Sequence, residues 1–204
     1  LGARDVAVEI NEDSIAPLAL NDMSRPSYRD AWDIDKMDAS GSISGIWASP
    51  PCQTFSNAGK GTGRDDIEQV LSMLDDGIYR SMLELKEKAL NLGDERTGLV
   101  LTPFTYAVKF SPRFIVLEQV PGVLPIWERG AVELRNMGYS VWTGVIDAAD
   151  HGIAQSRKRA YLIARNDGIP AAPPEAEERV TMFDVCGWGF TKRQSPTLTG
   201  HVAV

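Results

Sequence analysis

The chain has 204 residues, of which 43% are hydrophobic and 24% charged, and its formal net charge at pH 7 is −7. This composition is typical of a globular domain with one sizeable core, and no apolar run reaches the roughly 18 residues of a membrane-spanning helix. Two cysteines in unrelated surroundings exclude a disulfide framework, so we expect a reducing, cytoplasmic setting. The acidic charge disfavours a nucleic-acid partner, although basic residues do cluster at 157–159 and 192–193.

The first predicted strand covers residues 5–10 and carries an acid, Glu9, near its carboxyl end. In nucleotide-binding α/β folds an acid at this place commonly accepts hydrogen bonds from ribose hydroxyls, whereas a merely solvated acid is the alternative. Residues 11–21 are predicted to be helical, and residues 29–34 to form a second strand that closes on Asp33. No glycine-rich turn precedes the first strand, which predicts that an N-terminal cofactor loop is missing.

A short buried strand is predicted at residues 45–48, and a loop with a proline pair follows it. Cys52 lies in this loop directly after the prolines, where its thiol would be displayed at a strand end. A displayed thiol suits a nucleophile, while a buried structural role is the commoner one for a lone cysteine. The glycine-rich, basic segment 57–64 lacks the Gly-Lys-Ser/Thr ending of a P-loop and is predicted to be a mobile loop.

Residues 65–92 show helical periodicity, which Gly77 divides into two helices. Beyond them the predicted elements are, in chain order, a helix over 99–110, a strand over 113–118, a loop and helix over 121–137, and strands over 139–147 and 159–165. A shift to proline, alanine and glutamate over residues 166–178 predicts a linker.

Strands that alternate with helices predict an α/β fold, with a mostly parallel sheet flanked by helices. In such sheets, ligands gather beyond the carboxyl ends of the strands. Four chemically capable side chains lie at or just after predicted strand ends: Glu9, Asp33, Cys52 and Glu118. Their shared placement is poorly explained by chance, so we expect one site at this edge of the sheet.

Four segments resemble motifs of the DNA cytosine-C5 methyltransferase family. Pro51-Cys52-Gln53-Thr54-Phe55-Ser56 matches its Pro-Cys-Gln-x-Phe-Ser motif, and Glu118-Gln119-Val120 is similar to its Glu-Asn-Val motif, with Gln in place of Asn. The remaining two are Gln155-Ser156-Arg157-Lys158-Arg159, similar to Gln-x-Arg-x-Arg, and Arg193-Gln194-Ser195-Pro196-Thr197, similar to Arg-x-x-Pro-Thr. The segments occur in the order that the family has.

The resemblance implies a Rossmann-like methyltransferase that uses S-adenosyl-L-methionine to methylate carbon 5 of cytosine in double-stranded DNA. It implies that Cys52 adds as a thiolate to carbon 6, which makes carbon 5 nucleophilic. Glu118 would hold or protonate the ring at N3. Arg157 and Arg159 would grip the base and a flanking phosphate, with the base flipped out of the duplex.

By the same resemblance, further residues take binding roles. The implied cofactor contacts are Glu9, Ile10, Asp33, Ile34, Pro51 and Leu99. The implied substrate contacts are Gln53, Ser56 and Gln155. Taken from the residues alone, Glu118 is equally well a structural partner of Arg157 or Arg159, and the basic run 157–159 an ordinary solvated one. No cluster has the spacing of metal ligands, so no metal site is expected.

The resemblance implies a catalytic methyltransferase domain over residues 1–165, with a helical insertion at 65–92, and a linker with a remnant of the target-recognition region over 166–204. The implied protein is a cytoplasmic monomer, bacterial or phage-encoded, that binds no membrane and can have a restriction endonuclease as partner. Two alternatives stay open: a tRNA cytosine-5 methyltransferase, and a non-catalytic DNA-binding fragment of the family.

Overall fold

The computed structural model describes residues 7–20, 26–37, 43–51, 53–55 and 66–187. Strand β1 (Ala7–Val8) pairs in parallel with β2 (Pro26–Tyr28) in a small sheet. A second sheet has the strand order β3-β4-β6-β5. Its members are β3 (Gly45–Ala48), β4 (Phe114–Gln119), β5 (Ser140–Asp147) and β6 (Lys158–Arg165).

The larger sheet is mixed. β3 and β4 run parallel, whereas β6 lies antiparallel to both β4 and β5. The predicted α/β fold is therefore confirmed: β3, β4 and β5 run in the same direction, and β6, inserted between β4 and β5, is the one antiparallel member of this described sheet. The connection between β5 and β6, residues 148–157, is shorter than the dozen residues or more that a parallel crossover needs, so these two strands pair as a hairpin.

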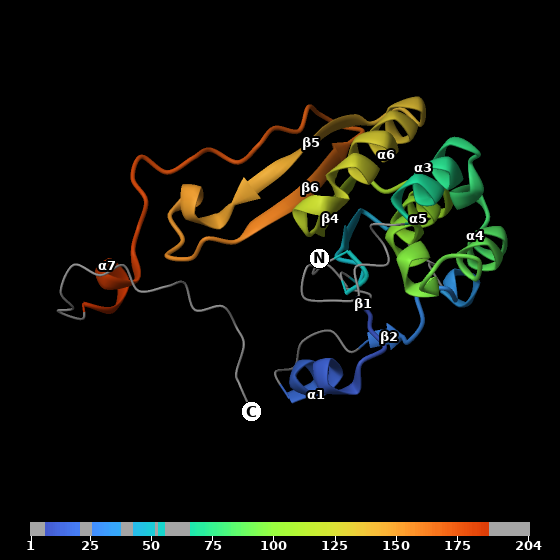
Figure 1. Ribbon diagram of the computed structural model, residues 1–204, viewed down its shortest axis with the longest axis horizontal. Helices are drawn as coiled ribbons and strands as arrows, with labels where there is room; N and C mark the ends of the chain where they lie inside the picture. Colours follow the sequence, from blue (N-terminus) through green and yellow to red (C-terminus); the bar gives the residue numbers. More distant parts are fainter. Residues whose placement is uncertain (1–6, 21–25, 38–42, 52, 56–65, 188–204) are drawn as a thin grey trace.

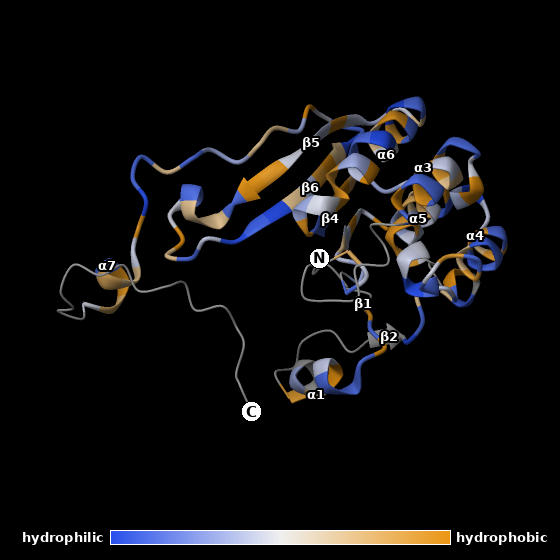
Figure 2. Ribbon diagram, viewed as in Figure 1, coloured by the Kyte–Doolittle hydropathy of each residue, from blue (hydrophilic) through white to orange (hydrophobic). Residues whose placement is uncertain are grey.

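Helices cover the sheet and extend it at one end (Figure 1). Helix α6 (Leu124–Asn136) packs against β5 and β6, and α3 (Ile67–Asp75) packs against α6. Helices α4 (Met82–Ala89) and α5 (Thr102–Phe110) complete this helical group. Figure 2 shows hydrophobic and hydrophilic residues alternating along these helices, as expected when each buries only one face.

The two helices expected within residues 65–92 are present. Gly77 adopts a φ of 72°, a left-handed conformation that costs glycine little, and separates α3 from a short 3₁₀ helix, Ile78–Arg80. Ser81 then caps α4 by accepting a hydrogen bond from the backbone N–H of Glu84. The helical character of the segment is thus confirmed.

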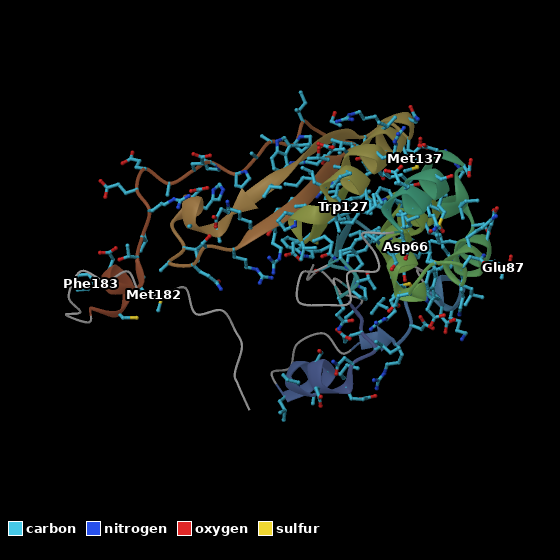
Figure 3. All side chains as sticks on the ribbon, in the orientation of Figure 1. Asp66, Glu87, Trp127, Met137, Met182 and Phe183 are labelled. Carbon is cyan, nitrogen blue, oxygen red and sulfur yellow. The ribbon has the colours of Figure 1, made fainter. Side chains whose placement is uncertain are left out.

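Aromatic side chains join the helices to the sheet. Trp127 of α6, labelled in Figure 3, is fully buried, and its indole N–H donates to the carbonyl of Ala160 on β6 over 3.3 Å. Phe104 of α5 contacts both Trp127 and Tyr79, with ring centroids 6.1 Å apart in each pair. Burying each ring contributes about 1.5–3 kcal/mol, which fixes α5 and α6 on the sheet that carries the site.

The strand predicted over residues 29–34 is wrong in its placement. The strand is Pro26–Tyr28, and a turn leads from it to a 3₁₀ helix, Ile34–Lys36. The carboxylate of Asp30 accepts from the backbone N–H of Trp32, and its carbonyl accepts from Asp33 N. These local hydrogen bonds favour a turn over an extended strand.

One further element differs from the sequence expectation, and the linker and the first helix agree with it. The helix predicted over 99–110 is a 3₁₀ helix, Glu95–Leu101, followed by α5. Residues 166–181 have no helix or strand, as expected of a linker, and lead to a short α7 (Met182–Cys186) that stands apart from the sheet (Figure 1). Near the start of the chain, helix α1 (Glu12–Leu20) lies within the helix predicted over residues 11–21.

Candidate active site

The site begins where the parallel strands β3 and β4 end side by side. Ala48 lies opposite Leu117, so the next residues, Ser49 and Glu118, share the same edge. The hydroxyl of Ser49 donates to Oε2 of Glu118 over 2.6 Å. The carboxylate of Glu118 is therefore held at the entrance to the loop that contains Cys52.

Two arginines reach the same carboxylate from β6 and the turn before it. Glu118 is paired with Tyr161 across the sheet, and residues two apart on a strand share a face, so Arg159 projects on the face of Glu118. Arg159 Nε lies 2.9 Å from Glu118 Oε1, and a terminal nitrogen of Arg157 lies 3.6 Å from the same oxygen. The structure thus brings together three of the four predicted catalytic residues.

The Glu118 side chain is only 16% exposed, whereas that of Arg157 is half exposed. The contact with Arg159 is a close ion pair, and the longer, solvent-facing contact with Arg157 contributes little by itself. A carboxylate offers about four lone-pair sites. Among the described residues only Ser49 and Arg159 approach within 3 Å, so the carboxylate keeps capacity to accept a hydrogen from a substrate, and Glu118 can both be oriented by the protein and bind a base.

The loop that carries Cys52 is anchored on both sides. Gln119, which is buried, donates from Nε2 to the carbonyl of Pro50 over 2.8 Å and accepts from the backbone N–H of Val120 over 2.6 Å. On the other side of Cys52, the ring of Phe55 is buried in the core. The longer side chain of Gln119, compared with asparagine, thus reaches the loop backbone directly.

Gln53, a predicted substrate contact, is held by Arg96, which is not among the predicted site residues. Arg96 donates from one terminal nitrogen to Gln53 Oε1 over 3.0 Å. Its other nitrogens form a two-pronged pair with Asp94, at 2.9 and 2.6 Å. Asp94 also caps the 3₁₀ helix by accepting from Arg96 N. The Asp-x-Arg spacing before Leu99 was the available sequence signal for this contact.

The predicted cofactor residues follow the ends of β1, β2 and β3. Glu9 comes directly after β1 and accepts from the backbone N–H of Asn11 over 2.7 Å, while the neighbouring Ile10 is 72% exposed. Asp33 precedes the 3₁₀ helix and pairs with Lys36 at 2.6 Å. Carboxylates such as those of Glu9 and Asp33 accept from ribose hydroxyls, and an exposed apolar side chain such as that of Ile10 can pack on adenine, so the residue types present fit S-adenosylmethionine. Pro51 is exposed beyond β3.

Two other predicted cofactor residues are less accessible. Ile34 is 2% exposed and belongs to the core, so only its backbone is available to a ligand. Its carbonyl accepts from Lys109 Nζ over 2.8 Å. Leu99 is half-buried in the 3₁₀ helix, and its carbonyl accepts from the hydroxyl of Thr102.

Helix α5 holds the turn that carries Asp33. The phenol of Tyr106 donates to the carbonyl of Ala31 over 2.7 Å. Burial of this phenol, together with the nearby carboxylates of Asp30 and Asp33, raises the pKa of Tyr106 to about 12. Tyr106 is therefore a hydrogen-bond donor throughout the physiological range of pH.

Some predicted residues are not brought into the cluster. The side chain of Gln155 is exposed, and its backbone N–H donates to the carbonyl of Ile153. Cys52 and Ser56 lie outside the described residues, so their roles stay predictions. Among the residues that the structure describes, no three His, Cys, Asp or Glu side chains are placed to hold a metal ion, and no helix is long and apolar enough to span a membrane.

Comparison with known proteins identifies relatives of this chain. A family model described as C-5 cytosine-specific DNA methylase matches residues 4–76 and 86–185. The chain is 28% identical over 136 residues to the type II methyltransferase M.DdeI of Desulfomicrobium norvegicum, which covers 63% of this chain and 26% of that protein. It is 29% identical over 155 residues to M.NgoPII of Neisseria gonorrhoeae, covering 70% and 37%. The chain thus spans well under half the length of these relatives.

Solved structures share the fold. An E. coli prophage protein described as a DNA modification methyltransferase superposes with a TM-score of 0.57 at 18% identity, covering 93% of this chain and 49% of that one. The Dnmt2 methyltransferase of S. pombe superposes with a TM-score of 0.52 at 19% identity, covering 81% and 42%.

Proposed function

Since the chain belongs to the C-5 cytosine-specific DNA methylase family, we propose that it transfers a methyl group from S-adenosylmethionine to carbon 5 of cytosine in DNA. The observation that carries the proposal is the cluster at the end of β4. Glu118 is bound there by Ser49 and Arg159, beside the anchored loop of Cys52. Three strands thus serve a single edge of the sheet: β3 leads into the loop of the nucleophile, β4 carries the carboxylate and β6 carries the guanidinium.

The chemistry divides among these residues as follows. The Cys52 thiolate forms a bond to carbon 6 of the flipped cytosine, and the displaced ring electrons make carbon 5 nucleophilic. Glu118 binds at N3, where it stabilises the proton that the ring takes up, and Arg159 orients Glu118. After carbon 5 has gained the methyl group, loss of its proton to a base restores the double bond and expels the thiolate.

S-adenosylmethionine, when bound, supplies the methyl group. The residues that would hold it are Glu9 and Asp33, by their carboxylates, and Ile10 and Pro51, by apolar contact, with Ile34 and Leu99 lining the site through the backbone or a partly buried side chain. Gln53, Ser56 and Gln155 are proposed to contact the DNA. Arg157, whose guanidinium is the more exposed of the two, is proposed to bind a phosphate next to the flipped base.

The domain division into residues 1–165 and 166–204 is part of this proposal, as are a monomeric state and a cytoplasmic setting. The similarity to type II methyltransferases supports a role in modification of DNA beside a partner restriction endonuclease. The native protein is purified from its own host by pull-down. If no endonuclease is found among the co-purified proteins, that partner is removed from the proposal.

The function is tested by trapping. Full-length protein is incubated with labelled S-adenosylmethionine and duplex DNA that contains 5-fluorocytosine, because the fluorine cannot leave as a proton and the covalent adduct accumulates. We expect a labelled, heat-stable protein–DNA adduct from the native protein and none from Cys52→Ala. A parallel reaction with tRNA separates the two nucleic-acid substrates. Failure of the native protein to form an adduct with either substrate, while it binds the cofactor, contradicts the proposal.

A further inference from the structure

The carboxylate of Asp147, the last residue of β5, joins the two ends of the loop between β5 and β6. It accepts three hydrogen bonds: from Ala149 N at 3.2 Å, from Ser156 Oγ at 2.9 Å and from Arg157 N at 2.9 Å. The backbone adds a fourth link, from Ala148 N to the carbonyl of Arg157 at 3.2 Å. Asp147, the acceptor of this clasp of three side-chain hydrogen bonds, is 7% exposed, whereas the donors Ser156 and Arg157 are exposed residues.

The clasp acts on the residues that bind Glu118. Asp147 holds the backbone of Arg157 itself, and Arg159 follows two residues later at the start of β6. The two guanidinium groups reach the same oxygen of Glu118, at 3.6 and 2.9 Å. Displacement of such groups by about 1 Å can cost on the order of 100-fold in rate, even when the change is made away from the reacting atoms.

The charge state of Asp147 suits a permanent acceptor. Burial by itself raises the pKa of this carboxyl, but the hydrogen bonds from Ala149, Ser156 and Arg157, and the charge of Arg179, outweigh burial and hold the pKa below its usual range. The group is therefore an anion at neutral pH and accepts all three hydrogens at once.

We propose that Asp147 is a positioning residue of the methyl transfer, which fixes the loop 148–157 and through it the guanidinium groups of Arg157 and Arg159 at Glu118. The inference rests on the proposed function for its effect on rate, but not for its effect on the loop. In this role Asp147 does not contact the substrate itself, but fixes the position of residues that do.

Three variants separate this role from a general loss of structure. Asp147→Ala removes every clasp contact of the side chain. Asp147→Asn keeps an oxygen for the two backbone N–H groups and an amide that can donate to the Ser156 hydroxyl. Asp167→Ala is the matched control, because Asp167 is also a hydrogen-bonded, low-pKa carboxylate but lies beyond the opposite end of β6, where it binds Arg165. Ser156→Ala, which removes one donor only, provides a comparison if Asp147→Ala fails to fold.

Two measurements are made on the full protein: steady-state methylation of duplex DNA, and hydrogen exchange at the amides of Ala149 and Arg157. For Asp147→Ala we expect kcat to fall at least about tenfold, with KM for S-adenosylmethionine within about twofold, and faster exchange at both amides. Asp147→Asn should recover most of both properties, Ser156→Ala should lie between, and Asp167→Ala should change neither.

A kcat for Asp147→Ala within twofold of the native value overturns the proposal, as does exchange no faster than in the native protein. If the native protein itself transfers no methyl group, the proposed function fails separately. The exchange rates then decide whether Asp147 fixes the loop.

Discussion

Arg159 and Glu118 meet on one face of the sheet, with Nε 2.9 Å from Oε1. They come from strands that run in opposite directions, and the antiparallel register of β4 with β6 is what places them together. Ser49, at the end of the parallel neighbour β3, closes the other side of the carboxylate at 2.6 Å. The site is thus assembled where a parallel and an antiparallel pairing meet on β4.

Arg159→Ala should lower kcat/KM for DNA methylation by roughly 10- to 100-fold. A loss of this size corresponds to about 1.4–2.7 kcal/mol, and removal of the guanidinium leaves the largely buried Glu118 carboxylate without its nearest counter-charge and free to rotate. Arg159→Lys should be intermediate, because lysine keeps the charge but lacks the planar fork. Arg129→Ala, which breaks an exposed pair with Asp75 on the helical side, is the control and should retain native activity. Equal activity of Arg159→Ala and the native protein would contradict the role given to this contact.

Gln119→Ala should destabilise the protein by about 1–3 kcal/mol, because it leaves the carbonyl of Pro50 and the N–H of Val120, both partly buried, without their partner. The free energy of unfolding is read from urea denaturation. Gln119→Asn should lose part of this stability, since the shorter amide cannot make both contacts. In each variant we expect faster alkylation of Cys52. The folded protein is alkylated and then digested, and the label is counted on the peptide that contains Cys52, so that Cys186 does not contribute. An unchanged alkylation rate would show that Gln119 does not anchor the loop.

Arg96→Ala should release Gln53 and reduce adduct formation with 5-fluorocytosine DNA, while leaving the free energy of unfolding nearly unchanged. The Arg96 side chain is partly exposed, and surface pairs of this kind contribute about 0–1 kcal/mol. We expect a several-fold slower adduct. Asp94→Asn should give the same defect, because Asp94 holds the guanidinium from its other side. A normal adduct rate in both variants would remove Arg96 from the site.

Alkaline titration should expose the role of Tyr106. Its pKa is raised from about 10 in the unfolded chain to about 12 in the folded one, by burial and then by Asp30 and Asp33. The folded state therefore binds the phenolic proton more tightly, and this stability is fully present below pH 10 and lost as the pH rises towards 12. Tyr106→Phe should unfold less steeply between pH 10 and 12. If the native protein and the variant show parallel pH curves, the phenol does not titrate as described.

Arg179→Ala should loosen the linker without changing the core. Arg179 Nε donates to Asp150 Oδ1 over 2.8 Å, and the N–H of Ala176 donates to the carbonyl of Asp150 over the same distance. These contacts hold the linker against the outer side of the loop between β5 and β6. We expect faster limited proteolysis within residues 166–181 and an unchanged thermal midpoint. Native-like cleavage would mean that the Arg179–Asp150 pair is not what holds the linker.

The sequence by itself determined much of the local structure and the family. The helical period of residues 65–92 and the break at Gly77 appear as expected, because both follow from local propensity and backbone freedom. Glu118 near the end of a buried strand, and the motif order that predicted a cytosine-C5 methyltransferase, could be read without coordinates, and the family is confirmed. The strand prediction at residues 29–34 is wrong because Asp30 forms local hydrogen bonds that favour a turn, and hydrophobic periodicity carries no information about such bonds.

Only the tertiary structure decided which of these residues meet. The sequence left open whether Arg157 or Arg159 would meet Glu118, and the insertion of β6 between β4 and β5 sets Arg159 in the closer contact, with Arg157 farther from the same oxygen. The contacts of Arg96 with Gln53, of Asp147 with Arg157, and of Lys109 on α5 with the carbonyl of Ile34 likewise join positions ten or more residues apart. The physical reason is common to all of them: propensity acts within a few residues, whereas strand register and side-chain packing join segments far apart in the chain.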